Sequence, residues 1–361
     1  MKKFLKFILP FAGILLFTAP ALTVAHAIFE QHPVLFIGSA AVSAIVLSVI
    51  KTPQIKGIFT AGIQKEIWEN DIVANLFKNN QFLNFAFNAD QYVVQGKIVH
   101  IPNAGATPNV VKNRGTLPAT VAQRTDVDIT YPLDEYTSDP ILIPHADTVE
   151  LSYDKRQSVT GEAQSKLRQE VAENMLVDWA APTANVVVTT GGAVLATAPA
   201  ATGNRALITL QDLQSAMTKM NLADVQMENR YALFDAHMYD QFIAQLTATQ
   251  YRDFSKSYDP ATGILGALFG FKIMMRSSVL IYDATNTVKP YGAAGATTDN
   301  EAVLCWQQNS VERALGEVVF YERVDDPTYY GDIYSFLLRM GGRIRRNDTQ
   351  GVVAIVQAPH A

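Results

Sequence analysis

The sequence has almost no cysteine, few charged residues and no excess of positive charge. Its single cysteine, Cys305, excludes an internal disulfide framework and any cysteine-built zinc or iron–sulfur site. Only 17% of the 361 residues are charged, against roughly 25% in an average soluble protein. The formal net charge of −5 gives no overall basic field that would favour nucleic-acid binding. The hydrophobic fraction of 48% excludes intrinsic disorder and is typical of a chain that hides surface against copies of itself.

Motifs for the common chemistries are also missing. There is no GxxxxGK[ST] phosphate loop, no GxGxxG, no HExxH and no GxSxG, and no two histidines have metal-ligand spacing. His145 with Asp147 could form an acid–base pair, but a histidine in a connecting segment explains it more simply. Asp126 with Asp128 could share a cation, but a charged edge strand explains them equally well. The sequence therefore predicts no catalytic, cofactor-binding or metal-ligating residue, and no enzyme.

Three smaller features have plain structural explanations. The adjacent carboxylates Asp134-Glu135 and Asp325-Asp326 would point opposite ways on an extended chain, which makes them poor acid–base pairs. Cys305 lies among apolar residues and is interpreted as a small buried side chain. Asn347-Asp348-Thr349 matches the glycosylation sequon, a pattern that is common by chance.

Arg339, Arg343, Arg345 and Arg346 form the only dense basic run of the sequence. Such a run can face nucleic acid or pair with acidic residues of a neighbouring subunit. A solvated face is the third interpretation.

The first 60 residues differ from the rest. Their apolar opening, which ends in the small residues Ala25-His26-Ala27, resembles a secretory signal. Residues 34–50 form an uncharged run at the lower limit for spanning a bilayer, and Lys51 would follow on the cytoplasmic side. The alternative is an apolar arm that packs against neighbouring subunits or a scaffold and never meets lipid.

Residues 90–145 are predicted to form strands and turns. Strand candidates cover residues 92–94, 98–101 and 121–131, where Val127 and Ile129 would share one face. A polar segment, 103–120, joins the last two strands. A long two-stranded arm has little core of its own and is marginal in water, so it is expected to lie on something else.

The clearest predicted helix covers residues 160–179, with apolar residues repeating every four positions from Ala163 to Trp179. Shorter helices are expected over 64–77, after Thr209 with Asp212 three residues later, and after Asp235. The remaining expected elements are strands over 186–188, 269–274, 279–282, 302–306, 318–323 and 352–357, with loops over 189–204 and 284–300. This mixture predicts an α+β fold.

Four stretches, in order, resemble tailed-phage major capsid proteins of the Hong Kong 97 type. They are Val94-Gln95-Gly96-Lys97-Ile98-Val99-His100-Ile101-Pro102, Tyr153-Asp154-Lys155-Arg156-Gln157-Ser158, Arg230-Tyr231-Ala232-Leu233-Phe234-Asp235 and Gly263-Ile264-Leu265-Gly266-Ala267-Leu268-Phe269-Gly270-Phe271-Lys272-Ile273. The resemblance implies an α+β fold with an N-terminal arm, an extended β-hairpin loop, a long spine helix, and peripheral and axial domains. The implied parts are an apolar signal-like or membrane-like arm (1–60), an N-arm helix region (61–89), the extended loop (90–145), the spine helix region (146–182), the mainly axial domain (183–310) and a return to peripheral and axial strands (311–361).

The resemblance also implies a function: a virion protein without catalytic activity that self-assembles into an icosahedral shell of hexamers and pentamers around double-stranded DNA. Assembly would take place in the host cytoplasm, with scaffold, portal and decoration proteins as further partners. Membrane contact through residues 1–50 is suggested by their apolar pattern alone, which departs from the charged or cleaved N-terminal segment common in the family. Some members of the family crosslink covalently through a lysine of the extended loop and an asparagine elsewhere. Lys97 and Lys112 lie in the loop, but no partner or catalytic acid is apparent, so no crosslink is expected.

Three alternatives remain open at this point. The first is an encapsulin-like compartment, which shares the fold and packages enzymes. The second is an exported, membrane-anchored surface-layer protein that uses residues 1–50 as signal and anchor. The third is an envelope hydrolase that uses His145 and Asp147, although no nucleophile motif accompanies them.

Overall fold

The computed structural model describes residues 58–103, 111–115, 127–144 and 155–360. The compact unit that carries the fold comprises the described residues from Ile67 onward. Some expectations rest on residues or side chains outside this description: the apolar segments within residues 1–50, the His145–Asp147 pair and the Asp126–Asp128 pair. Among the helices that are described, none is long and apolar enough to cross a membrane.

The unit is built around a seven-stranded mixed sheet. In spatial order its strands are β11 (Gly266–Leu268), β12 (Phe271–Arg276), β10 (Arg230–Asp235), β14 (Asn300–Gln307), β17 (Val352–Val356) and β7 (Val186–Val188), and β13 (Leu280–Tyr282) also pairs with β14. Every residue of β10, β14 and β17 is buried, because side chains cover both faces of the sheet. Residues 302–306 of β14 and all of β17 are continuous apolar runs, which is why the sequence predicts these two strands, whereas β10, bounded by Arg230 and Asp235, was not predicted as a strand.

The two faces of this sheet belong to two different hydrophobic clusters. Along β14, Leu304 and Trp306 lie in the first cluster, whereas Val303 and Cys305 lie in the second. This alternation follows from the two-residue period of side chains in a strand. The second cluster is completed by three helices, α6 (Leu210–Leu222), α7 (Ala236–Ala244) and α8 (Ala248–Ser255). The sheet is therefore packed on both sides.

A long hairpin carries the second sheet. Its strands, in spatial order, are β1 (Phe87–Asn88), β15 (Val311–Asp326), β16 (Gly331–Ile344) and β5 (Asp134–Thr137), and β6 (Ile141–Pro144) also pairs with β16. Two smaller sheets join β2 (Val93–Val94), β3 (Ile98–Asn103) and β4 (Val127–Pro132), and β8 (Ala193–Leu195), β9 (Asn204–Ala206) and β18 (Pro359–His360). Four short 3₁₀ turns complete the described elements: η1 (Gln81–Phe85), η2 (Asp90–Tyr92), η3 (Thr183–Asn185) and η4 (Gln308–Ser310).

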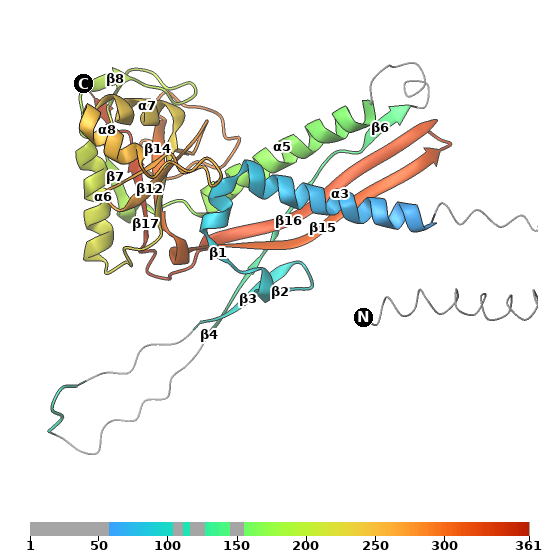
Figure 1. Cartoon of the computed structure of the whole chain (residues 1–361), viewed down its shortest axis with the longest axis horizontal. Helices are drawn as coiled ribbons and strands as arrows, with labels where there is room; N and C mark the ends of the chain where they lie inside the picture. The colour runs from blue at the N-terminus through green and yellow to red at the C-terminus, as the bar shows by residue number, and fades with distance from the viewer. Residues whose placement is uncertain (1–57, 104–110, 116–126, 145–154, 361) are drawn as a thin grey trace, which may run out of the picture. The chain divides into compact units, whose positions relative to one another are not determined.

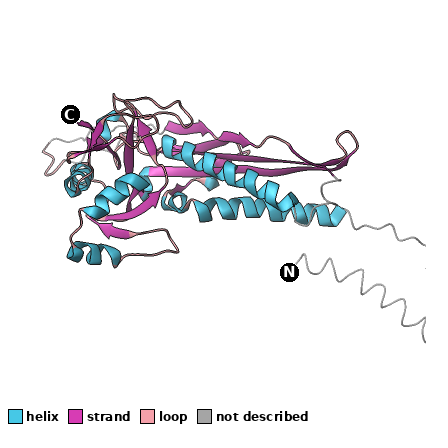
Figure 2. Cartoon of the chain, turned by 90° about the horizontal axis from the view of Figure 1, so that it is seen from above, coloured by secondary structure: helices cyan, strands magenta, loops and turns pink. Residues whose placement is uncertain are grey.

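The helix α5 (Lys155–Asp178) runs beside the hairpin in both views (Figures 1 and 2). Its apolar ridge is buried as predicted, with Val171 and the following Trp179 fully covered. The indole N–H of Trp179 donates to the backbone oxygen of Glu312 on β15 at 2.9 Å. Gly342 permits this close approach, because a Cβ there would lie 2.7 Å from that oxygen and 2.8 Å from the indole nitrogen.

The structure confirms most predicted elements and extends several. The short helix is longer than predicted, as α3 (Ile58–Asn79), and the cap of α6 is the predicted Thr209–Asp212 box. The strand predicted over 318–323 is present but is part of the longer β15, and its partner β16 was not predicted; together they form a hairpin of 16 and 14 residues. The prediction of a loop over 189–204 was wrong in part, since β8 lies within it and β9 begins at its end.

Candidate functional site

The base of the predicted arm is a three-stranded sheet formed by β2, β3 and β4, here called the β arm. Ile101 pairs with Ile129 in the register of β3 and β4. The described part of the arm is held to the hairpin by a small cluster of five buried apolar residues: Ala89, Val99, Ile101, Leu133 and Ala314. This cluster is far smaller than either cluster around the seven-stranded sheet, so the arm has little core of its own.

Glycine allows the arm to approach the hairpin at backbone distance. A Cβ at Gly316 of β15 would lie 2.5 Å from the carbonyl oxygen of Gly96 and 2.6 Å from Leu133 Cδ1. The pairing of β15 with β16 shifts register between Leu315 and Val318, which places a bulge at this glycine. The N–H of Glu317 donates to the Gly96 oxygen at 3.4 Å. Arm and hairpin therefore meet through backbone and small side chains.

Three arginines of the predicted basic run form ion pairs near this junction: Arg339 and Arg343 lie on β16, and Arg345 follows its last residue. Arg343 Nε lies 2.7 Å from Oε1 of Glu312, a carboxylate with no exposed surface, and Arg345 Nε lies 3.9 Å from its other oxygen. Arg339 pairs with Glu135 of β5 at 2.5 Å. A buried carboxylate without a cation is costly, so the Glu312 pairs hold β15 against β16, and the Arg339 pair holds β5 against β16.

Aromatic rings complete the same junction. The Arg345 guanidinium lies 3.9 Å from the ring centre of Phe87 on β1, and that of Arg343 lies 5.3 Å from the ring centre of Tyr131 on β4. Burial, and then the negative charge of Glu312, raises the pKa of the Tyr131 hydroxyl far above its usual range. This phenol stays neutral at any physiological pH.

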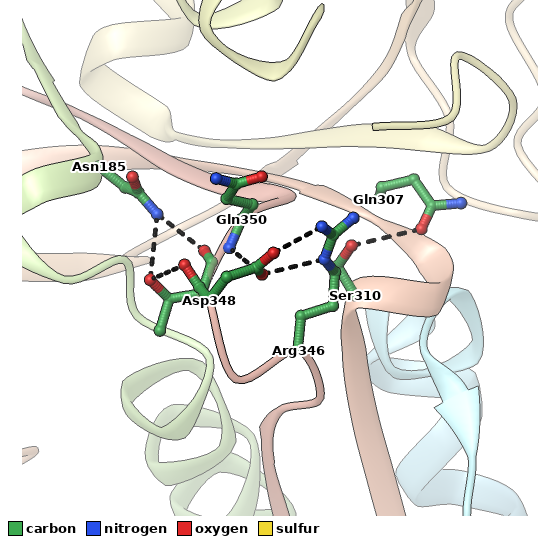
Figure 3. A network of polar contacts seen from close by, with 7 residues as sticks. Asn185, Gln307, Ser310, Arg346, Asp348 and Gln350 are labelled. Carbon is green, nitrogen blue, oxygen red and sulfur yellow. Dashed lines mark hydrogen bonds and ion pairs between the residues drawn. The ribbon is translucent and has the colours of Figure 1, made fainter. Parts of the chain in front are cut away.

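Arg346, the last member of the run, stabilises a turn. Its guanidinium makes two parallel contacts with Asp348, at 3.0 and 2.6 Å (Figure 3). The N–H of Gln350 donates to the same carboxylate at 3.1 Å, and the side chain of Asn185 donates to the backbone oxygen of Thr349 at 2.7 Å. All four arginines thus have acidic partners within this chain, while Arg345 and Arg346 keep 36% and 39% of their side-chain surface exposed, so contact of the run with nucleic acid or a neighbouring subunit stays a prediction.

One carboxyl group near this junction has a pKa close to neutral pH. Asp178, the last residue of α5, has its pKa raised to about 7, first by burial and then by the negative charge of Asp134 on β5. The N–H of Gly342 donates to this carboxylate and opposes the shift. The contact of α5 with β5 and β16 therefore carries a charge that changes between mildly acidic and neutral pH.

The far end of the hairpin and the outer side of the arm expose large apolar side chains. At the hairpin end, here called the hairpin tip, these are Tyr321, Val324, Tyr329 and Tyr330, with Leu142 of β6 nearby in the pairing; on the arm they are Val94, Ile98 and Val111. Tyr330 is 78% exposed. Single exposed apolar residues are ordinary, but groups of them mark surfaces that other molecules cover.

The other residues that the sequence singled out are dispersed. Cys305 is fully buried in β14, as predicted, and burial raises its thiol pKa far above the usual range. Asp325 is exposed and Asp326 buried, as expected for neighbours on an extended chain. Lys97 and Lys112 are exposed. None of these groups meets another to form a reactive pair in the described part of the chain.

The sequence did not indicate the importance of Glu312 and Arg313, which are adjacent on β15. Glu312 pairs with Arg343 and Arg345, and Arg313 contacts the segment before the arm. Arg313 donates to the backbone oxygen of Leu83 at 2.9 Å and lies 3.5 Å from the Asp90 carboxylate. Their partners lie tens to hundreds of residues away in sequence, so no local pattern could have identified them. The glycines at 316 and 342 were the only local signal of close packing.

Solved phage capsid structures are similar to this chain over most of its length. The capsid of Ralstonia phage GP4 has a TM-score of 0.55 at 13% identity, over 77% of this chain and 88% of that chain. The capsid of Cyanophage P-SCSP1u gives 0.52 at 18% identity, over 75% and 86%. The head structure of Helicobacter pylori bacteriophage KHP40 gives 0.51 at 12% identity, over 75% and 89%.

The chain has the Hong Kong 97-type capsid fold. The fold class predicted from the sequence is thus confirmed, with the long helix beside a long hairpin and a mixed sheet covered by helices. At these identities the similarity establishes the fold alone. No protein-family model and no curated protein matches the sequence.

Proposed function

We propose that this chain is the major capsid protein of a tailed phage or prophage and self-assembles into an icosahedral shell of hexamers and pentamers around double-stranded DNA. The observation that carries the proposal is the combination of this fold with a poorly supported β arm and an exposed apolar hairpin tip. Both surfaces lack burial within the described chain and gain it when a neighbouring copy covers them.

The predicted division of labour fits this proposal. Residues 90–145 act as the extended loop that lies on an adjacent subunit, 146–182 provide the spine helix, and 183–310 form most of the axial domain. Residues 311–361 return through the hairpin to the seven-stranded sheet. The first 60 residues serve as an arm that contacts scaffold, neighbouring subunits or a membrane during assembly in the host cytoplasm.

The proposed partners follow from the proposed shell. Copies of this chain are the main ones, with scaffold, portal and decoration proteins as accessory components and packaged DNA contacted without sequence specificity. No residue of the described chain is proposed to act catalytically.

The test is electron microscopy of the full chain, produced alone and together with the adjacent virion genes. We expect closed particles of uniform size in at least one of these preparations. A folded chain that stays monomeric at high concentration in both would contradict the proposal. Packaged protein cargo in place of DNA would instead favour the encapsulin-like alternative, and envelope fractionation without particles would favour the surface-layer alternative.

A matched pair of variants sharpens the test at the hairpin tip. Tyr330→Glu places a charge on the exposed ring position, so we expect particles to be lost while the melting temperature of the unassembled chain stays within about 1–2 °C, as for other surface changes. Tyr330→Phe keeps the ring and should assemble. Normal particles from the Tyr330→Glu variant would exclude the tip from assembly.

A further inference from the structure

Two carboxylates and an imidazole converge at the edge of the seven-stranded sheet, away from the β arm and the hairpin. Asp235 ends β10 and caps α7, His237 lies in the first turn of α7, and Glu301 is the second residue of the adjacent strand β14. Because β10 and β14 pair antiparallel, the end of one strand lies beside the start of the other. This pairing brings Glu301 to Asp235 and His237 across 64 residues of sequence.

The distances among the three groups match those of ligands around one metal ion. His237 Nδ1 lies 3.3 Å from Asp235 Oδ1 and 3.3 Å from Glu301 Oε1, and one ligand atom from each residue lies within 4.8 Å of the others. Metal–ligand bonds of roughly 2.0–2.2 Å at tetrahedral or octahedral angles separate neighbouring ligand atoms by about 3.0–3.5 Å. The imidazole nitrogen therefore points between the two carboxylates at ligand spacing.

Burial favours a cation at this position. The side chains of Asp235 and Glu301 are only 3% and 8% exposed, and in the described part of the chain the ion pairs of both are made with His237. Two desolvated carboxylates this close repel each other and lose hydration, a cost that a bound cation offsets. A histidine that is 57% exposed is a weak counter-charge for the pair.

The surroundings hold the carboxylates in place. The backbone N–H of His237 donates to Asp235 Oδ1 at 2.8 Å, and the hydroxyl of Thr197 donates to Glu301 Oε2. The backbone of Glu301 is fixed on both sides by Gln357, whose N–H donates to its oxygen at 3.0 Å and whose side chain accepts from its N–H at 3.4 Å. Hydrogen bonds of this kind orient metal ligands and set their affinity.

We propose that Asp235, His237 and Glu301 bind one divalent transition-metal ion, Zn²⁺ in the first instance, through one atom each. The ion takes the place of the proton on His237 Nδ1, so the three side chains keep their positions. Water completes the coordination on the side of His237, which faces solvent. An imidazole nitrogen with two carboxylates suits Zn²⁺ and excludes Mg²⁺ and Ca²⁺, which prefer oxygen ligands alone.

A bound ion would link three separate parts of the chain: the start of α7, the start of β14 and, through Thr197, the segment that follows β8. It would therefore stabilise this end of the sheet in the folded state. The inference rests on these residues alone and holds whether or not the chain forms a shell.

The test is zinc binding by the chelator-treated full-length protein, measured by isothermal titration and by elemental mass spectrometry after gel filtration. We expect about one Zn²⁺ per chain and a melting temperature that rises with Zn²⁺ concentration but not with Mg²⁺ or Ca²⁺. His237→Ala and Glu301→Gln should each weaken binding at least about tenfold. Co²⁺ in place of Zn²⁺ should give visible absorption that His237→Ala abolishes.

Matched controls are His100→Ala, on the β arm, and Asp253→Asn, an exposed carboxylate of α8; both should bind zinc like the wild type. His237 is half-exposed, so its alanine variant is expected to fold even if Glu301→Gln does not, and circular dichroism checks this. No zinc binding by the wild type at about 100 μM would overturn the proposal. Unchanged binding by a folded His237→Ala variant would do the same and leave the three groups as an ion-pair triad.

Discussion

The seven-stranded sheet and the β arm are both β structure, yet they are supported in opposite ways. Each face of the sheet packs against a large cluster of buried side chains, and β14 contributes to both. The arm rests on five buried apolar residues, on backbone contacts around Gly96 and Gly316, and on the contact of the Tyr131 ring with Arg343. The first region stabilises itself within one chain, whereas the second needs another surface to cover it.

The largest loss of folding stability is expected from a substitution in the core of the seven-stranded sheet. Trp306→Ala in β14 removes a fully buried indole that stacks near Tyr231 and Trp179 and donates to the Phe85 oxygen at 2.9 Å. We expect a loss of about 3–5 kcal/mol in the free energy of unfolding, measured by denaturant titration of unassembled chain. Leu222→Ala, at an 83% exposed position, is the control and should change stability little. Equal effects of the two variants would contradict the difference in packing.

A smaller effect on stability, but a large one on assembly, is expected at the arm. Gly316→Val would drive its side chain into the Gly96 oxygen and Leu133, so the arm should separate from the hairpin while the sheet stays folded. We expect about 1–2 kcal/mol of destabilisation and faster hydrogen exchange over residues 93–103 and 127–132, without faster exchange in β14.

Gly192→Ala serves as the control for that variant, since no atom lies within 4 Å of a Cβ at this glycine. It should leave exchange in the arm unchanged. If Gly316→Val exchanged hydrogen faster throughout, including in β14, then arm and sheet would unfold as one unit. The proposed difference in how the two regions are supported would then be wrong.

The smallest effect on stability is expected from the pH dependence of the contact of α5 with β5 and β16. The pKa of Asp178 is raised to about 7 from an ordinary value of 3.8, so between about pH 4 and 7 the folded chain holds a proton that the unfolded chain has released. Stability from this group is therefore present at low pH and falls as pH rises toward 7. Asp178→Asn should be more stable than wild type above pH 7 and similar near pH 4, because the variant carries no charge that must be buried.

Thermal melts of both proteins across this pH range measure the difference. Asp134→Asn removes the second cause of the shift and should move the midpoint of the pH dependence downward. Parallel pH profiles for wild type and Asp178→Asn would contradict the assignment of the charge to this residue.

The parts of the fold that could be predicted are those whose signals are local. The ridge of α5 repeats every four residues, the α6 cap lies within three residues of sequence, and residues 302–306 of β14 form one continuous apolar run. The full hairpin could not be predicted, because its strands contain Glu312, Arg343 and two neighbouring glycines that interrupt the alternation of a half-buried strand. These residues are tolerated because their partners, in other strands and in α5, meet them only in the folded chain.

The same distinction applies to the candidate sites. A cluster of four arginines is visible in the sequence, but its acidic partners are not: Arg339 meets Glu135 across 204 residues, and Arg343 meets Glu312 across 31. The Asp235, His237 and Glu301 group is hidden for the same reason. The sequence showed which residues carry charge. The pairing of strands in the folded chain showed which residue of opposite charge lies beside each of them.

The double role of β14 has a practical consequence for engineering. Inserting one residue into this strand would exchange the sides on which Val303, Leu304 and Cys305 point, and so would disturb two cores at once. Peptide display or fluorescent tagging therefore belongs in the solvent-exposed turn at residues 291–298, just before the strand begins, where added length leaves the alternation intact.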